Sequence, residues 1–114
     1  MEKNMEPFIP VITKHFVCRV NLKDILYITS YKRKIRLVTT EGNIEFYEQM
    51  NNMIPYMDRR FCRCLKTLCI NMERVEKMEA QRIYFENGEF IPLGRDNFVR
   101  TRQLYASWLK NLIN

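Results

Sequence analysis

Hydrophobic and polar residues alternate along most of the first half of the chain. β-branched and aromatic residues recur at near-alternate positions in four segments, 17–20, 24–29, 34–40 and 43–48. A period of two is typical of β-strands with one buried face. Lys34 and Arg36 alternate with Ile35 and Leu37, which predicts that this strand exposes one face to water. The first half is therefore expected to form an antiparallel meander.

Two later segments have a helical period instead. Between Glu48 and Asp58, methionine and isoleucine recur at helical spacings, which predicts a short helix that Pro55 limits to two or three turns. Its methionines are expected to pack in the core rather than to bind a partner. The last 20 residues predict an amphipathic helix with Asp96 or Asn97 as its N-cap. Its apolar positions, which either close the core or dock a partner, are Phe98, Leu104, Tyr105, Trp108, Leu109 and Leu112.

Strand patterns return between these two helices, in 61–71 and 74–94. The pair Asn87-Gly88 predicts a two-residue hairpin of type I′, in which both residues have positive φ. No internal repeat is visible in the sequence. A length of 114 residues leaves room for one domain, so the sequence predicts a mostly β domain over 11–114. A flexible N-terminal arm is expected over 1–10, where Pro7 and Pro10 interrupt a polar stretch.

Charge is unevenly distributed along the chain. There are 19 Lys and Arg residues against 13 Asp and Glu, which gives a net charge of +6. Three windows, 31–36, 59–66 and 95–102, hold 11 of these cations and a single acid, Asp96. If the fold gathers the windows on one side, their charge favours a polyanionic partner. The alternative is that they are three unrelated solvated patches.

The residues that enzymes and metal sites need are largely missing from the sequence. Four cysteines without a secretory signal favour reduced thiols, buried as small hydrophobes, in a cytoplasmic protein. A zinc site is not expected because Cys62 and Cys64 are separated by one residue and His15 is the only histidine. The three glycines are isolated, so no phosphate-binding loop is present. We therefore expect a non-enzyme without metal or cofactor, and no apolar segment long enough to span a membrane.

Three stretches of the sequence together resemble one family. They are DILYITSYKRKIRLVTTEGNIEFYEQM, RFCRCLKTLCINMERVEKM and FENGEFIPLGR, and with their order and spacing residues 12–105 resemble the LytTR-type DNA-binding domain of bacterial transcriptional regulators. The resemblance implies an elongated, mostly antiparallel β fold with a short central helix and a C-terminal helix. It also implies sequence-specific binding of double-stranded DNA by loops in the major groove, on direct repeats at promoters. A homodimer, tandem binding or a regulatory protein partner would fit such a regulator.

The same resemblance implies which residues face DNA. Arg33 and Lys34 match the first basic turn of the family, Lys66 and Thr67 follow the Phe-x-Arg strand, and Arg95 ends the last strand. Bases would be read by the loops around Arg33, Lys66 and Arg95. Phosphates would be held by Lys32, Lys34 and Arg63.

Other positions depart from the family or match it for structural reasons. Asn71 matches a family signature, but its place beside Ile70 favours a structural hydrogen-bonding role. Leu65 and Leu93 stand where the family often has histidine and serine, so the base preference is expected to differ. Most relatives also have an N-terminal receiver domain, whereas this chain offers only a short arm. A phosphorylation switch is therefore not expected within it.

The sequence is also compatible with two other functions. The first is a protein-interaction module that uses the C-terminal helix around Trp108. The second is an RNA-binding β domain that stacks bases on Tyr31 or Tyr47, which requires these aromatic rings to be exposed on a sheet.

Overall fold

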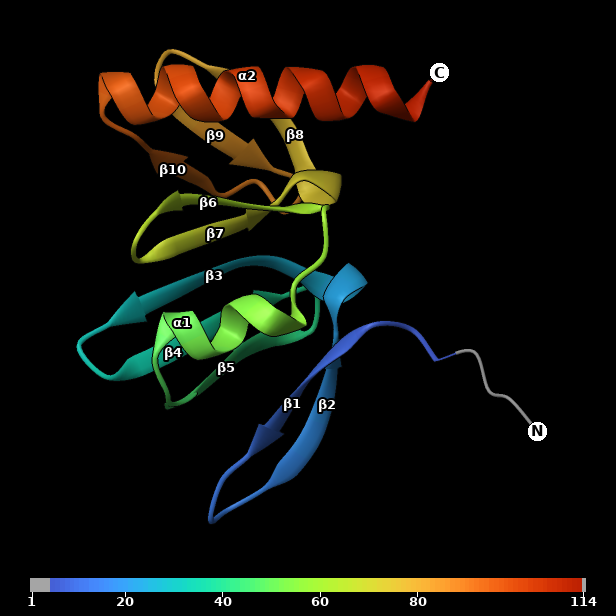
Figure 1. Cartoon of the computed structure of the whole chain (residues 1–114). Helices are drawn as coiled ribbons and strands as arrows, with labels where there is room; N and C mark the ends of the chain where they lie inside the picture. Colours follow the sequence, from blue (N-terminus) through green and yellow to red (C-terminus); the bar gives the residue numbers. More distant parts are fainter. Residues whose placement is uncertain (1–4, 114) are drawn as a thin grey trace.

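A computed structural model describes residues 5–113, which fold into three antiparallel sheets and two helices (Figure 1). A five-stranded sheet has the order β5-β4-β3-β7-β6, a three-stranded sheet the order β10-β9-β8, and β1 and β2 form a hairpin of their own. The strands are β1 Phe8–Ile12, β2 Val17–Asn21, β3 Ile25–Tyr31, β4 Lys34–Thr39, β5 Gly42–Tyr47, β6 Phe61–Leu65, β7 Leu68–Asn71, β8 Val75–Glu79, β9 Arg82–Phe85 and β10 Phe90–Pro92. The expected fold class is confirmed. The described residues extend over 41 × 39 × 24 Å, so the molecule is long in two directions and thin in the third.

The five-stranded sheet has an apolar core on each face. One core packs this sheet against the β1–β2 hairpin and the central helix, and the other packs it against the three-stranded sheet and the C-terminal helix. In β7 the side chains alternate between the two cores, with Cys69 in the first and Leu68 and Ile70 in the second. β7 is therefore buried on both faces, whereas the first half of β4 keeps the exposed face that Lys34 and Arg36 predicted.

The central helix is shorter than its sequence pattern. α1, Met50–Met53, continues into the 3₁₀ turn η2, Ile54–Tyr56, because Pro55 cannot donate the next helical hydrogen bond. Met50 and Met53 are buried in the first core, which confirms that the methionine stripe is structural.

The C-terminal helix α2, Arg95–Leu112, crosses β6 with only part of the expected apolar face buried. Phe98, Tyr105 and Trp108 pack against the second core around the buried Thr101. Leu104, Leu109 and Leu112 remain 42% to 59% exposed, and Leu104 and Leu112 line open hollows beside Trp108. The N-cap position is Gly94, not Asp96 or Asn97 as expected, because the helix already begins at Arg95.

Both halves of the chain repeat one local structure that the sequence did not reveal. The 3₁₀ turns η1, Leu22–Asp24, and η3, Met72–Arg74, each follow a strand that ends in asparagine. Each turn leads into a strand with a register shift after its first residue, at Ile25 in β3 and Val75 in β8. The two units share a pattern of only five residues, Asn21–Ile25 and Asn71–Val75, in which asparagine is followed by an apolar, two charged and a β-branched residue. This pattern is too short to stand out as a repeat in the sequence.

Two further expectations about loops are corrected. β1 begins at Phe8 and buries Ile9 completely, so the flexible arm expected over 1–10 does not include residues 8–10. Residues 1–4 lie outside the described part of the chain. Asn87-Gly88 does not form a type I′ turn, because only Gly88 of the pair has a positive φ, of 92°, and β9 and β10 are joined by the longer loop 86–89. A two-residue turn with both φ values positive occurs instead at Ala80 and Gln81.

Candidate nucleic-acid interface

Three connections that carry basic residues lie at the same edge of the molecule. In Figure 1 the β3–β4 turn, the β6–β7 turn and the start of α2 are all at the left, and the C-terminus is at the right. β3 and β6 both run toward this edge. We refer to the side with Lys32, Arg33, Lys66, Thr67 and Arg95 as the basic edge.

The β3–β4 turn consists of Lys32 and Arg33, between the paired residues Tyr31 and Lys34. Lys32 has a φ of 58°, which a lysine adopts only at some cost in free energy. Its ammonium group lies 5.4 Å from the centre of the Tyr31 ring. The Glu48 amide donates to the Arg33 carbonyl at 2.9 Å, so the turn is tied to the segment before α1.

The β6–β7 turn consists of Lys66 and Thr67, and both of their carbonyl groups are held. The Arg63 guanidinium donates to the Lys66 carbonyl at 2.9 Å. The Ser30 amide donates to the Thr67 carbonyl at 3.0 Å, which places this turn beside the end of β3. Both turn side chains are exposed. Arg63, expected to hold phosphate, also uses one of its nitrogen atoms to support Lys66.

The third connection leads from β10 through Leu93 and Gly94 into α2, and Arg95 is the first helical residue. Leu93 is buried in the second core, and the Leu93 amide donates to the Gln81 carbonyl at 2.9 Å. This packing fixes the chain immediately before Arg95 and leaves Arg95 itself exposed. The Leu93 side chain therefore fills a core position.

The basic residues in and next to the edge differ in whether an acidic side chain forms an ion pair with them. Among residues 5–113, no ion pair includes Lys32, Arg33, Lys66 or Arg95. Lys34, in contrast, lies 3.6 Å from a carboxylate oxygen of Glu45. The Arg36 guanidinium donates to the same carboxylate at 2.7 Å and holds the pKa of Glu45 below its usual range. Lys34 is thus partly neutralised, unlike its neighbours in the turn.

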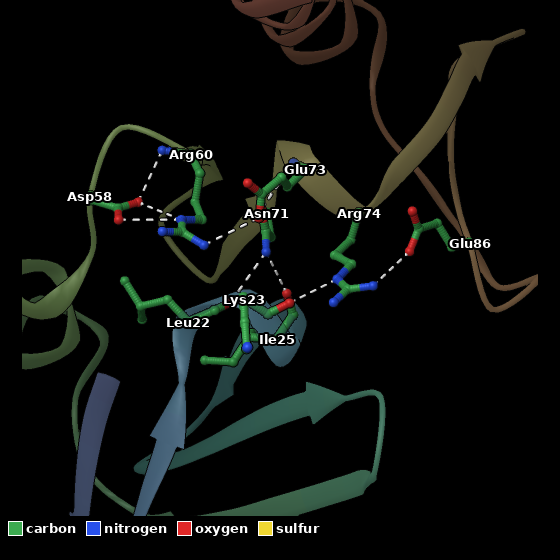
Figure 2. Close-up of polar contacts among 9 residues, drawn as sticks. All are labelled: Leu22, Lys23, Ile25, Asp58, Arg60, Asn71, Glu73, Arg74 and Glu86. Carbon is green, nitrogen blue, oxygen red and sulfur yellow. Dashed lines mark hydrogen bonds and ion pairs between the residues drawn. The ribbon is translucent and has the colours of Figure 1, made fainter. Parts of the chain in front are cut away.

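The basic window 59–66 is divided between two ends of the molecule. Lys66 lies on the basic edge, whereas Arg60 lies at the start of β6, where it forms ion pairs with Asp58 at 3.0 Å and Glu73 at 3.1 Å. Figure 2 shows Arg60 within a polar cluster around Asn71 that includes the 3₁₀ turn η3. The one-sided surface expected from the three windows is therefore built from parts of each of them.

Asn71 has the structural role that its sequence context favoured. Its side chain is completely buried and donates to the carbonyls of Leu22 at 3.3 Å and Ile25 at 2.8 Å. Its amide oxygen accepts the Glu73 amide at 2.9 Å. Asn71 thereby connects η1 and η3, and the neighbouring Arg74 donates to the Lys23 carbonyl at 2.8 Å (Figure 2).

The cysteines are free thiols, and three of the four are buried. Burial raises the pKa of Cys69 to about 11, and the neighbouring Cys62 together with burial raises the pKa of Cys64 as well. Because the thiolate is the reactive species, we predict that Cys64 and Cys69 react slowly with a thiol reagent at pH 8 and that the partly exposed Cys18 reacts first. Mass spectrometry after brief alkylation measures this order, and early labelling of Cys64 would contradict it.

One residue beside the basic edge, Arg100, is not among the site residues predicted from the sequence. Arg100, in the second turn of α2, donates to the Cys64 carbonyl at 2.6 Å and to the Asn97 side chain at 3.2 Å. An open hollow of about 420 Å³ lies between the β6–β7 turn and α2 and is lined by Arg63, Cys64, Leu65, Lys66, Asn97 and Arg100. The sequence holds no signal for this contact because α2 and β6 are far apart along the chain.

The described residues contain neither a cluster of metal-ligating side chains nor a helix that could span a membrane. Across positions 5–113 there is no group of three or more His, Cys, Asp or Glu side chains placed to hold a metal ion. The helices of this same part of the chain are too short or too polar to cross a membrane. What the interface offers chemically is exposed positive charge and hydrogen-bond donors on fixed turns.

Comparisons with known proteins identify the family. The family described as the LytTr DNA-binding domain matches residues 16–106. The fold is similar to a solved LytTr DNA-binding domain from Bacillus cereus, with a TM-score of 0.71 and 14% sequence identity, over 88% of this chain and 97% of that one. No curated protein matches the chain. The chain therefore belongs to the LytTr DNA-binding domain family, whose members are DNA-binding domains of transcription regulation rather than enzymes.

Proposed function

We propose that the chain binds specific sequences of double-stranded DNA through the basic edge, whose turns enter the major groove of a promoter. Lys66, Thr67, Arg95 and Arg33 reach base edges in this proposal. Lys32, Lys34 and Arg63 contact phosphates. Two copies on a direct repeat, as a homodimer or in tandem, would let one regulator occupy successive grooves.

The observation that carries the proposal is that three basic connections, distant in sequence, lie on one edge without acidic partners for Lys32, Arg33, Lys66 and Arg95 within residues 5–113. Their backbones are held by hydrogen bonds and core packing, so their side chains project from fixed positions. Fixed donors lose less conformational freedom on binding than donors on mobile loops. Lys and Arg bind guanine O6 and N7 in the major groove, which gives such donors sequence preference.

The direct test is a fluorescence anisotropy titration with duplexes selected from a random pool, at several salt concentrations. A selected duplex is expected to bind at least about a thousandfold more tightly than a scrambled one. The slope of log K against log salt counts the phosphate contacts. Equal binding to all duplexes that disappears by physiological salt would reject sequence-specific binding and leave only an electrostatic surface.

Lys32 gives a prediction about phosphate contacts alone. Replacing Lys32 with alanine is expected to weaken binding to selected and scrambled duplexes about equally, because the exposed ammonium group at the turn contacts the backbone rather than a base. The slope of log K against log salt should become smaller by about one. Lys110→Ala, at the far end of α2, is the charge-matched control and should leave the slope unchanged. An unaltered slope in Lys32→Ala would mean that Lys32 contacts no phosphate.

Exposed aromatic rings favour RNA binding as a second candidate function. Tyr31 and Tyr47 are 75% and 79% exposed, and both are paired with Lys34 across neighbouring strands. Rings in this arrangement can stack unpaired bases. Single-stranded RNA that competes better than duplex DNA in the same titration would select this function. The interaction module around Trp108 has less support, since Trp108 packs against the second core.

A further inference from the structure

We propose that Arg100 is a positioning residue for DNA recognition: it sets the orientation of the Lys66-Thr67 turn relative to Arg95 without contacting DNA itself. This inference rests on the proposed function of the basic edge. It concerns the contact between α2 and strand β6, where the guanidinium of Arg100 donates to an irregular part of the strand.

Strand β6 contains an extra residue just before the β6–β7 turn. Arg63 is paired with Cys69 and Leu65 with Leu68, so Cys64 has no partner of its own on β7. A bulge of this kind leaves backbone groups outside the ladder and bends the strand, which redirects the residues that follow. The residues that follow here are Leu65, Lys66 and Thr67. The direction of the turn therefore depends on how the bulge is held.

Arg100 supplies the missing partner for the bulged residue. Its guanidinium donates to the Cys64 carbonyl at 2.6 Å and lies 3.4 Å from the Arg63 carbonyl. A third contact, to the Asn97 side chain at 3.2 Å, holds the guanidinium against its own helix. Charged donors make stronger hydrogen bonds than neutral ones. The bulge is thus fastened to α2 at a point five residues after Arg95.

The same guanidinium connects the two base-reading elements of the proposed function. Lys66 follows the bulge by two residues, and Arg95 lies on the helix that Arg100 belongs to. Arg63 extends the connection, since it donates to the Lys66 carbonyl at 2.9 Å. Because the donors of Arg100 are directed at protein carbonyls, Arg100 is not expected to contact a phosphate. Loss of Arg100 should let the turn and the helix move relative to each other.

A salt titration separates positioning from phosphate contact. Arg100→Ala is expected to reduce the ratio of specific to non-specific affinity at least tenfold, while the slope of log K against log salt stays within about 0.3 of the unaltered protein. A phosphate contact would instead lower the slope by about one and leave the ratio nearly constant. That second result would overturn the proposal. Arg102→Ala, which removes the same charge two residues later on α2, is the matched control and should leave the ratio unchanged.

Three further measurements make the result independent of stability and of the proposed function. Thermal unfolding followed by circular dichroism identifies a variant that is simply less folded, and Arg100→Lys, which keeps the charge without the forked donors, should show the same loss of specificity as Arg100→Ala. Amide chemical shifts of the free protein should change at Leu65, Lys66 and Thr67 in Arg100→Ala but not in Arg102→Ala. If the unaltered protein prefers no sequence, the proposed function fails. Unchanged shifts at these amides overturn the positioning role whatever the DNA result.

Discussion

Replacing Asn71 with alanine is expected to lower the free energy of unfolding by about 3 kcal/mol. The side chain is fully buried and makes hydrogen bonds to the Leu22 and Ile25 carbonyls and to the Glu73 amide. Each buried hydrogen bond contributes roughly 1 kcal/mol, and groups left without a partner add to the loss. The bonds also join η1 to η3, so the variant loosens the junction between the two halves of the fold. Urea denaturation measures the change, and the melting temperature should fall by on the order of 10 °C.

The internal repeat provides a matched control for this variant. Asn21 occupies the same place before η1 that Asn71 occupies before η3, but its side chain makes no capping hydrogen bond and is only half-buried. Asn21→Ala should therefore cost less than about 1 kcal/mol. Similar losses in both variants would show that the buried hydrogen bonds of Asn71 are not what stabilises the junction.

Replacing Lys66 and Arg95 together with alanine is expected to remove most of the preference for a selected duplex. Each residue in the proposed function reads one or two base pairs, and each loss should cost about 1 to 3 kcal/mol, or about 5- to 150-fold in Kd. The two side chains lie on separate elements, the β6–β7 turn and α2, so the double variant should lose the contribution of both. Their exposure and the core packing behind them mean that folding should be unaffected.

The single variants distinguish base reading from attraction by charge. Lys66→Ala should relax discrimination at one part of the binding site and Arg95→Ala at another, measured with duplexes that carry single base changes. Lys110→Ala removes an equal charge from the far end of α2 and should leave the pattern of discrimination intact. If each single variant weakened binding equally on every duplex, Lys66 and Arg95 would be phosphate contacts and the base-reading role would be wrong.

Much of the fold follows from local patterns in the sequence. Alternation predicts the strands because a sheet exposes side chains to two faces in turn, and this holds for Ile35 and Leu37 between Lys34 and Arg36. The methionine spacing predicts α1, and Pro55 limits it. In α2 the same patterns overestimated the buried face, because Leu104 and Leu109 have helical spacing but remain 46% and 42% exposed. A helical period defines a stripe, but the neighbouring elements decide how wide a stripe they cover.

The interface depends on tertiary structure more strongly than the individual strands and helices do. By itself the sequence determined that positive charge is concentrated in three windows and, with its motifs, which family the chain resembles. Only the fold decided that Lys66 and Arg95 share an edge, that Glu45 neutralises Lys34, and that Arg100 reaches the bulge at Cys64. Local propensity acts over a few residues, whereas these contacts join side chains to groups 11 to 36 residues away. Such pairs are set by strand register and by the packing of a helix on a sheet, which no local pattern specifies.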